Sequence, residues 1–529
     1  MADQGLSRGT VLALFAMGLG VIVIANDFTA LNVALPAMEQ DFDVDVGTIQ
    51  WTVNAYALVF GMGLVTGGRL ADMLGRRKIF FIGTGIFAGF SLLGAIAPSA
   101  LALIGARVGM GVGGALMWPA ILGMTFAALP ADRAGLAGGL ILGIAGLGNA
   151  LGPLIGGVLT DEFSWRAIFW LNLPIAAFAV LATAKFVHEP PVEATERRID
   201  YLGIATVSAG LVLLLLGLDQ AVDWGWTDIR VLAMFAAGVA LLVAFLGIER
   251  RAGEAALIPP EVLANKGFRA ACLTVLLLSA VFFSIVLYGP QLMEKVLGFS
   301  ALKAGFGMLP MLGLFGVVAF LTGRLYDRLG GRRVIIAGTA LLAAGPLVVS
   351  FFGADSSYAV LIPGLALTGI GAGFFYPSIT TAAVTMLDAS RSSLAGGITY
   401  MFQIAGGAIG LGLTTALFTS RSEDLVVSEA SDAGLQMTGD RAGVIHGYLA
   451  GTEPGNAAFN QFDSSVADKV LDVVKDSFVG GIQLSLRVVA AIAVIGLVIA
   501  ILRVRPPATA PAPAKPGPGD ATAPEPASA

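Results

Sequence analysis

The chain has 529 residues, of which 56% are hydrophobic and only 13% are charged, and its mean hydropathy is +0.84. A water-soluble chain of this length would divide into domains whose surfaces need far more charge. The composition therefore excludes the soluble classes and predicts that the lipid bilayer surrounds most of the chain. The single cysteine, Cys272, and two distant histidines, His188 and His446, argue against a metal cluster. We expect no metal, no cofactor and no nucleic-acid partner.

Apolar segments of about 20 residues, the length that crosses the hydrocarbon core of a bilayer, recur along the chain. The first begins near Gly9 and continues past Ala34, which is too long for the core of a cleaved signal peptide, so we expect it to be retained. The sequence predicts an all-α integral membrane protein with 14 transmembrane helices, at 10–34, 48–68, 79–97, 99–124, 135–160, 167–187, 200–218, 229–248, 268–289, 304–323, 333–352, 358–386, 392–419 and 480–502.

The distribution of Lys and Arg orients these helices, because basic residues concentrate in cytoplasmic loops. With the N-terminus inside, the inner segments hold 21 of the 31 basic residues and the outer segments hold 8, while Arg107 and Arg487 fall within helices. We therefore expect both termini in the cytoplasm and the protein in the cell (inner or plasma) membrane. The first outer loop agrees, since it has no basic residue and four acidic ones, Glu39, Asp41, Asp43 and Asp45.

Two segments are predicted to lie outside the membrane. Residues 420–478 are polar and acidic and are expected to form a long outer loop, ending in an amphipathic stretch that leads into the last helix. Residues 506–529 are rich in Pro and Ala and are expected to form a disordered cytoplasmic tail.

The chain also repeats itself. GRLADMLGRRK at 68–78 aligns with GRLYDRLGGRR at 323–333, and the segment 133–152 aligns with 391–410. Both copies follow an even number of predicted helices and so have the same orientation, which predicts two parallel bundles related by an axis along the membrane normal. The predicted division is an N-terminal six-helix bundle, two linking helices with a loop, and a C-terminal six-helix bundle, at 1–199, 200–266 and 267–505.

Four motifs carry the functional information. They are the loop at 68–78, Arg107 within LIGARVGMGVGG, GNALGPLIGG at 148–157, and NDFTALNVALP at 26–36. Through these motifs the chain resembles the major facilitator superfamily, and within it the 14-span drug:proton antiporter branch of EmrB/QacA-like proteins. The resemblance extends to about residue 505 and implies the major facilitator fold, with two six-helix bundles and two inserted helices.

The loop motif predicts a conformational latch on the inner side. Its carboxylate can pair with neighbouring cations and with a helix N-terminus, and such contacts hold two bundles together until they rock apart. The alternative is a positive-inside anchor with a glycine turn. The residues assigned to the latch, including a weaker echo in the second repeat, are Gly68, Asp72, Gly75, Arg76, Arg77 and Asp327.

The glycine-rich stretch resembles the antiporter motif of the branch. Glycines let neighbouring helices approach closely, and a proline removes one backbone hydrogen bond and bends its helix. The second repeat has Leu411 at the position of the proline, so the proline belongs to one half only. Close packing without a functional role is the alternative. The motif residues are Gly148, Gly152, Pro153, Gly156 and Gly157.

Asp27 and Arg107 are the charged residues predicted deep within the N-terminal bundle. Charged groups inside a membrane are costly and usually mark a proton or ion pathway. The two residues lie about 7 and 8 positions from the outer ends of their helices, so at a rise of about 1.5 Å per residue they share a depth. The alternatives are an Asp27 bonded to Thr29, Asn32 or nearby backbone, and an Arg107 that snorkels to the outer interface. We expect the pair to couple protons to substrate.

Other side chains receive weaker assignments. The stretch SWRAIFWLNLP at 164–174 also resembles the branch and is predicted to be an interfacial aromatic anchor. Aromatic and methionine side chains within the helices could line an adaptable pocket, although packing or lipid contact is their commoner role. These are Phe15, Met62, Trp118, Phe282, Phe283, Tyr376, Tyr400, Met401 and Phe402.

The expected function is multidrug efflux by a monomeric, proton-coupled antiporter that is not an enzyme. The dipeptide Gly-Lys does not occur, which excludes a Walker A loop for ATP. The family resemblance implies export of lipophilic or amphiphilic small molecules in exchange for protons. Predicted helices nine to thirteen have no acidic residue in their interiors, which favours neutral or singly charged substrates. The alternatives are an exporter dedicated to one metabolite, antibiotic or lipid and, more remotely, a non-transporting membrane sensor.

Overall fold

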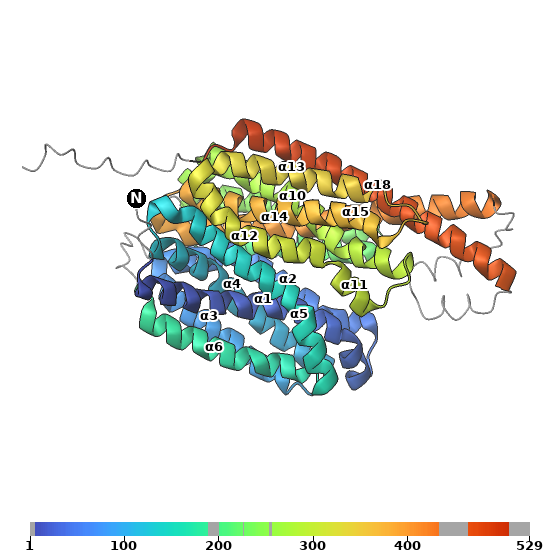
Figure 1. The fold of residues 1–529 in the computed structure, drawn as a ribbon. Coiled ribbons are helices and arrows are strands. Elements are labelled where there is room, and N and C mark those ends of the chain that lie inside the picture. Colours follow the sequence, from blue (N-terminus) through green and yellow to red (C-terminus); the bar gives the residue numbers. More distant parts are fainter. Residues whose placement is uncertain (1–5, 189–199, 226, 253–255, 433–463, 507–529) are drawn as a thin grey trace, which may run out of the picture.

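The computed structural model describes residues 6–188, 200–225, 227–252, 256–432 and 464–506. Within these ranges, 14 helices are long and apolar enough to cross a membrane, which confirms the predicted number. They form two layers in Figure 1, with the first half of the chain below and the second half above. We call the end of the bundle where α1 begins the inner end, and the opposite end the outer end.

The helices of the first half are α1 (Arg8–Phe42), α2 (Val46–Leu74), α3 (Arg76–Ala95), α4 (Ala100–Ala128), α5 (Ala134–Glu162) and α6 (Arg166–Phe186). The second half contains α10 (Lys266–Lys295), α12 (Leu309–Leu329), α13 (Gly331–Val349), α14 (Tyr358–Thr385), α15 (Ser392–Asp432) and α18 (Ser464–Arg503). Between the halves come α7 (Tyr201–Trp224) and α8 (Ile229–Ala252). The short elements are η1 (Ala131–Arg133), α9 (Pro260–Ala264), α11 (Ala301–Gly307) and η3 (Ala389–Arg391).

The packing of the two halves follows the internal repeat. In the first half α1 packs on α5 and α6, and in the second half α10 packs on α15 and α18 in the same way. The halves meet where α2 contacts α15 and where α12 contacts α5. The inserted helices α7 and α8 pack on each other, and α7 also contacts both α2 and α15. The inserted pair therefore lies beside the contact between α2 and α15, one of the two places where the halves meet.

Local sequence signals place the helix ends. Asp45 caps α2 by accepting a hydrogen bond from the Thr48 amide at 2.8 Å, as a side-chain oxygen at an N-cap does. Gly75 joins α2 directly to α3 with a φ of 106°, and Gly330 joins α12 to α13 with a φ of 83°. Side chains other than glycine rarely adopt these angles. Gly75 of the predicted latch thus has a turn-forming role that its repeat shares.

Several helices extend beyond the predicted boundaries. Hydropathy detects the part of a helix that crosses lipid, whereas α1 has 35 residues and a length of about 50 Å. The predicted outer segment 420–478 is helical at both described ends. Its N-terminal end was not expected to be helical, and α15 continues to Asp432, whereas α18 begins at Ser464 and so includes the predicted amphipathic stretch that leads into the last helix. The polar ends of these two helices project past the bundle in Figure 1. The predicted tail at 506–529 lies, except for its first residue, outside the described residues.

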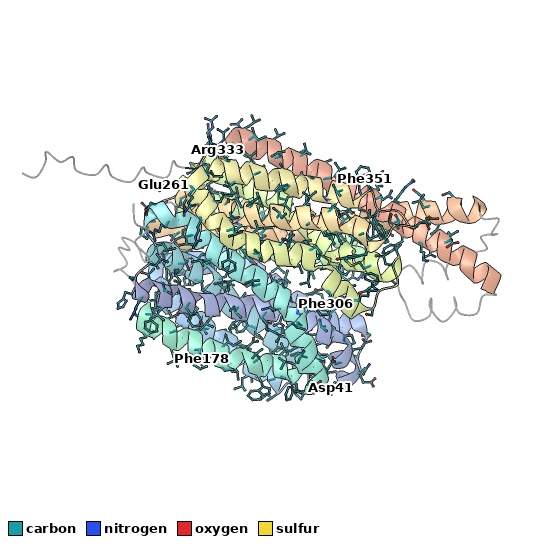
Figure 2. The ribbon with its side chains drawn as sticks, in the orientation of Figure 1. Asp41, Phe178, Glu261, Phe306, Arg333 and Phe351 are labelled. Carbon is teal, nitrogen blue, oxygen red and sulfur yellow. The ribbon has the colours of Figure 1, made fainter. Side chains whose placement is uncertain are left out.

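Figure 2 shows side chains at both ends of the bundle. Glu261 and Arg333 lie at the inner end, Asp41 lies at the outer end, and Phe178 lies on the outward side of α6 with 65% of its surface exposed. An exposed phenylalanine on an apolar helix suits contact with lipid, because the hydrocarbon core does not penalise it.

Candidate functional site

The centre of the first half contains an ion pair that is fully buried. A guanidinium nitrogen of Arg107 on α4 lies 2.5 Å from an Asp27 carboxylate oxygen on α1, and both side chains are 0% exposed. Arg107 also donates from Nε to the Thr52 carbonyl of α2 at 2.8 Å. Removing two charges from water is unfavourable unless they pair and form further hydrogen bonds. The ion pair and the Thr52 carbonyl supply such contacts, while Nη2 of Arg107 is buried without a hydrogen-bond partner.

The second oxygen of Asp27 has a neutral partner. Asn172 on α6 donates from Nδ2 to Asp27 Oδ1 at 3.0 Å and to the Ser91 hydroxyl on α3 at 3.2 Å. The Ser91 hydroxyl in turn donates to the Phe169 carbonyl at 2.9 Å. One carboxylate therefore connects α1 with α4 on one side and with α3 and α6 on the other.

An aromatic layer separates the ion pair from the second half. The Arg107 guanidinium lies 4.2 Å from the ring centre of Tyr56, which stacks on Phe60 at 5.8 Å. Phe60 meets Tyr400 of α15 edge-on at 5.8 Å, and Trp118 lies 4.4 Å from the same Tyr400 ring. A cation on an aromatic face is attracted to it, and aromatic pairs at these distances stabilise each other. The layer gives the ion pair a packed connection to the opposite half.

The structure places the remaining aromatic candidates in different environments. Phe15 has 61% of its surface exposed and faces outward, so it does not line a pocket between the halves. Tyr376 is buried in the second half, where its ring lies near Phe282 and its hydroxyl is 3.2 Å from the Ser279 hydroxyl. Tyr376 and Phe282 therefore belong to a cluster within the second half.

Asp72 connects the two halves at the inner end. Its carboxylate accepts hydrogen bonds from the Ser393 amide at 3.2 Å and the Leu394 amide at 2.8 Å, at the start of α15. The first amides of a helix lack partners within that helix, and the helix dipole there favours a negative charge. Gly68, one turn earlier on α2, allows this contact, because a Cβ there would lie 2.8 Å from the Leu394 Cα.

Arg76 and Arg77 extend these contacts. Arg76 donates to Asp72 at 3.1 Å, to the Gly123 carbonyl of α4 at 3.2 Å and to the Ala389 carbonyl of the second half at 2.7 Å. Arg77 donates to the Ala184 carbonyl of α6 at 2.7 Å, within its own half. Arg76 thus bonds from the first half to the second.

Asp327 makes the equivalent contact from the other side. Its carboxylate accepts from the Gly135 amide at 2.9 Å, at the start of α5. A Cβ on Gly323 would lie 2.9 Å from the Leu136 Cα, which repeats the approach of Gly68 to Leu394. Each half therefore presents an aspartate to the first turn of a helix in the other half.

We expect Asp72→Asn to lower transport roughly tenfold, since a hydrogen bond to a charged group contributes about 1.5–3 kcal/mol and this carboxylate joins the two halves at the inner end. Asp327→Asn should have a smaller effect, because Asp72 also forms an ion pair with Arg76 at 3.1 Å. The check is the initial rate of export at matched expression. Full activity of both variants would indicate that the loop is only a positive-inside anchor.

The glycines of the antiporter motif bring α5 against α1 beside Asp27. A Cβ on Gly148 would lie 2.9 Å from that of Ala25, and Cβ atoms on Gly152 and Gly156 would overlap Thr29 and Ala30. In the second half, Gly406 and Gly410 approach α10 equally closely. The shared glycines thus serve packing in both halves, whereas Pro153 lies within the continuous helix α5 and its counterpart in α15 is Leu411. Gly157 has only an ordinary contact, at 3.7 Å from Val33.

The geometry differs from the structural alternatives considered for Asp27 and Arg107. Thr29 and Asn32 donate to backbone carbonyls of α1, while Asp27 bonds to Arg107 and Asn172. Arg107 has no exposed surface, so it does not snorkel to an interface.

The stretch at 164–174, predicted to be an interfacial aromatic anchor, contains one exposed and one buried tryptophan, and Trp170 is the exposed one at 47%. Trp165 is 3% exposed and donates to Asp41 at 3.2 Å, joining the start of α6 to the end of α1. Asn172, in the same stretch, was missed. A lone amide among apolar residues next to Pro174 was the available signal.

Two helical halves that exchange contacts at one end, with a buried charge pair in one of them, define a membrane transporter. The sequence model of the Major Facilitator Superfamily matches residues 17–411, and the chain belongs to that family. The family resemblance and the fold predicted from the motifs are thereby confirmed.

Curated relatives extend over most of the chain. It is 29% identical over 496 residues to the tetracenomycin C resistance and export protein of Streptomyces glaucescens, covering 92% of this chain and 90% of that protein. It is 34% identical over 421 residues to the cephamycin export protein CmcT of Amycolatopsis lactamdurans, covering 78% and 86%. It is 31% identical over 406 residues to the multidrug resistance protein Stp of Mycobacterium tuberculosis, covering 77% and 75%.

A solved structure supports the same fold. The crystal structure of the human organic anion transporter MFSD10 (TETRAN) superimposes with a TM-score of 0.63 at 14% identity, covering 93% of this chain and 100% of that chain.

Proposed function

We propose that this protein is a proton-driven antiporter that exports lipophilic or amphiphilic small molecules. The observation that carries the proposal is the Asp27–Arg107 pair, which has no exposed surface and lies inside one half of a transporter fold. Relatives over most of the chain are named as antibiotic export and multidrug resistance proteins. Export is the direction that these names favour.

The pair offers a means of coupling. An ionised Asp27 holds Arg107 by charge and by hydrogen bonding, and a proton on the carboxyl removes the charge attraction. Arg107 also lies on the Tyr56 ring, from which the aromatic layer reaches Tyr400 in the other half. A change in the position of the guanidinium is therefore transmitted to the surface between the halves, where a substrate of this fold would bind.

The contacts at the inner end would stabilise the state of the transporter that is closed on that side. Asp72 and Asp327 each hold the start of a helix in the opposite half. Opening the inner end requires both carboxylates to leave these amides, which water can then hydrate. The two halves, with the division 1–199, 200–266 and 267–505, would rock about the aromatic layer between them.

The substrate class follows from the charge inside the fold. In the described part of the chain, Asp27 and Glu249 are the acidic residues that are buried as whole residues, and Glu249 accepts the Leu257 and Ile258 amides. With no buried carboxylate found in the described part of the second half, neutral or singly charged amphiphiles fit better than dications. A monomer with small-molecule substrates and protons as its partners is the simplest form.

An exporter dedicated to a single antibiotic is the second candidate, since two relatives are named for one compound each. A panel of chemically diverse compounds, tested in cells without other pumps, separates the candidates. Resistance to several unrelated amphiphiles supports broad export, and resistance to one compound supports dedicated export.

The test of proton coupling is efflux from proteoliposomes. An imposed pH gradient should drive export of a compound identified by the panel, and a protonophore should abolish it. Export that continues unchanged without a gradient would refute proton coupling, and no export of any panel compound would favour a sensor.

The proposed location is the cell membrane, with both termini in the cytoplasm. We expect Ser428→Cys to react with an impermeant thiol reagent in intact cells and Arg505→Cys not to react. Both variants are made with Cys272→Ser, which removes the single, buried native cysteine. A permeant reagent should label both sites. Labelling of position 505 from outside would overturn the orientation.

A further inference from the structure

The Asn172 amide is bonded to Asp27 through only one of its two ends. Its Nδ2 donates both to Asp27 and to Ser91, whereas its Oδ1 is buried and has no hydrogen-bond partner. Asn172 itself is 0% exposed. A buried acceptor without a partner is rare and unfavourable, because it has lost its hydrogen bonds to water and gained none within the protein. The unpaired Oδ1 of Asn172 therefore needs a physical explanation.

The two side chains that bond to Asp27 are both hydrogen-bond donors. Arg107 from α4 is the charged group that faces it, and Tyr56 from α2, beneath the guanidinium, is the other titratable side chain. Ser91 and Asn172 from α3 and α6 are neutral, and α5 presents Gly148 and Gly152 to this part of α1. These contacts suit a carboxylate, which only accepts hydrogen bonds.

A protonated Asp27 has a different requirement, because its O–H group must donate. Arg107 has no acceptor atom and cannot receive that hydrogen bond. An asparagine amide carries a donor and an acceptor of nearly equal size, and rotation about its terminal torsion exchanges their positions. After such a rotation the carbonyl oxygen would occupy the present place of Nδ2, which lies 3.0 Å from Asp27 Oδ1.

We propose that Asn172 is a positioning residue that serves both protonation states of Asp27 by turning its amide. It donates to the carboxylate when Asp27 is charged and accepts from the carboxylic acid when Asp27 holds a proton. The proton stays on the Asp27 oxygen, and no covalent bond to Asn172 forms or breaks. This role rests on the proposed proton coupling at Asp27 and adds a second residue to it.

The same rotation carries the protonation state into α3 and α6. Ser91 now accepts from Asn172 and donates to the Phe169 carbonyl. With the carbonyl of Asn172 turned towards it, the Ser91 hydroxyl loses the hydrogen bond that it now accepts, and its single proton can be donated either to Asn172 or to the Phe169 carbonyl. Protonation of one carboxyl thus rearranges hydrogen bonds on three helices of the first half.

Infrared difference spectra of the reconstituted protein across a pH step test this role. The C=O stretch of a protonated carboxyl that disappears in Asp27→Asn identifies Asp27. In Asn172→Leu this band should move to a higher wavenumber, because the acid has lost its acceptor, and export should fall roughly tenfold or more. Asn172→Val removes the same amide with a smaller side chain, in case leucine does not fit. Ser91→Ala is the matched control, since it retains the amide, and its band should stay near the parental position.

Each outcome decides a different question. An Asp27 band that stays at the parental wavenumber in both the leucine and the valine variants would overturn the role of Asn172 and leave the coupling role of Asp27 intact. A parental protein without any Asp27-dependent band would instead show that Asp27 does not take up a proton, and the proposed function would fail with it. A shifted band in Asn172→Leu, with the Ser91→Ala band unmoved, supports the amide rotation.

Discussion

Asp27→Asn is expected to abolish export driven by a pH gradient and to leave the protein folded and inserted. Asparagine has the shape of aspartate, but its amide cannot take up a proton at the pH values on either side of such a gradient. Its carbonyl oxygen can still accept from Arg107, which also retains the Thr52 carbonyl at 2.8 Å and the Tyr56 ring at 4.2 Å. The measurement is substrate efflux from proteoliposomes against an imposed gradient, at matched protein density.

Asp27→Glu is the matched control for this result. It preserves a carboxyl group about one methylene further out, so we expect partial export. Parental export by Asp27→Asn, together with collapse of the pH gradient, would show that coupling resides elsewhere and that this aspartate is structural.

Arg107→Ala is expected to be inactive and also less stable than the parent. Breaking a buried ion pair by removing one partner costs about 3–5 kcal/mol, because it leaves an uncompensated charge. Asp27 would retain only its bond to Asn172, at 3.0 Å. Thermal unfolding of the purified protein and efflux at matched density measure the two effects.

The double variant Asp27→Asn/Arg107→Ala separates the charge from the packing. It removes both charges, so it should regain much of the stability that Arg107→Ala loses and should still not export. If Arg107→Ala unfolds at the parental temperature, the pair is not held in a buried environment and the coupling scheme loses its basis.

Hydropathy was sufficient to predict the helices, because lipid requires every spanning segment to be apolar and to satisfy its own backbone. It could not predict where helices continue into water, and α15 and α18 extend well beyond the predicted ends. The sequence repeat also predicted that the two halves are parallel bundles of the same orientation. It did not reveal that Asp327 caps α5 as Asp72 caps α15, because the second copy has Gly331 in place of Arg76 and so lacks the full pattern of the first.

The candidate site was predictable only in part. Asp27 and Arg107 stood out because charge is rare within apolar segments, and counting residues from the helix ends placed them at one depth. Neutral polar residues give a weaker signal than charged ones, because Asn172, Ser91 and Thr52 are common side chains whose partners depend on helix rotation. That rotation is set by contacts such as Gly148 and Gly152 against α1, and only the folded protein provides them.

Proton release on substrate addition tests the central claim most directly. Purified protein in a weakly buffered solution would receive a compound identified by the export panel, with the pH followed by an indicator dye. We predict that the parental protein releases protons in proportion to the substrate bound and that Asp27→Asn binds the compound without release. Equal proton release by the two proteins would contradict the assignment of Asp27 as the group that exchanges protons for substrate.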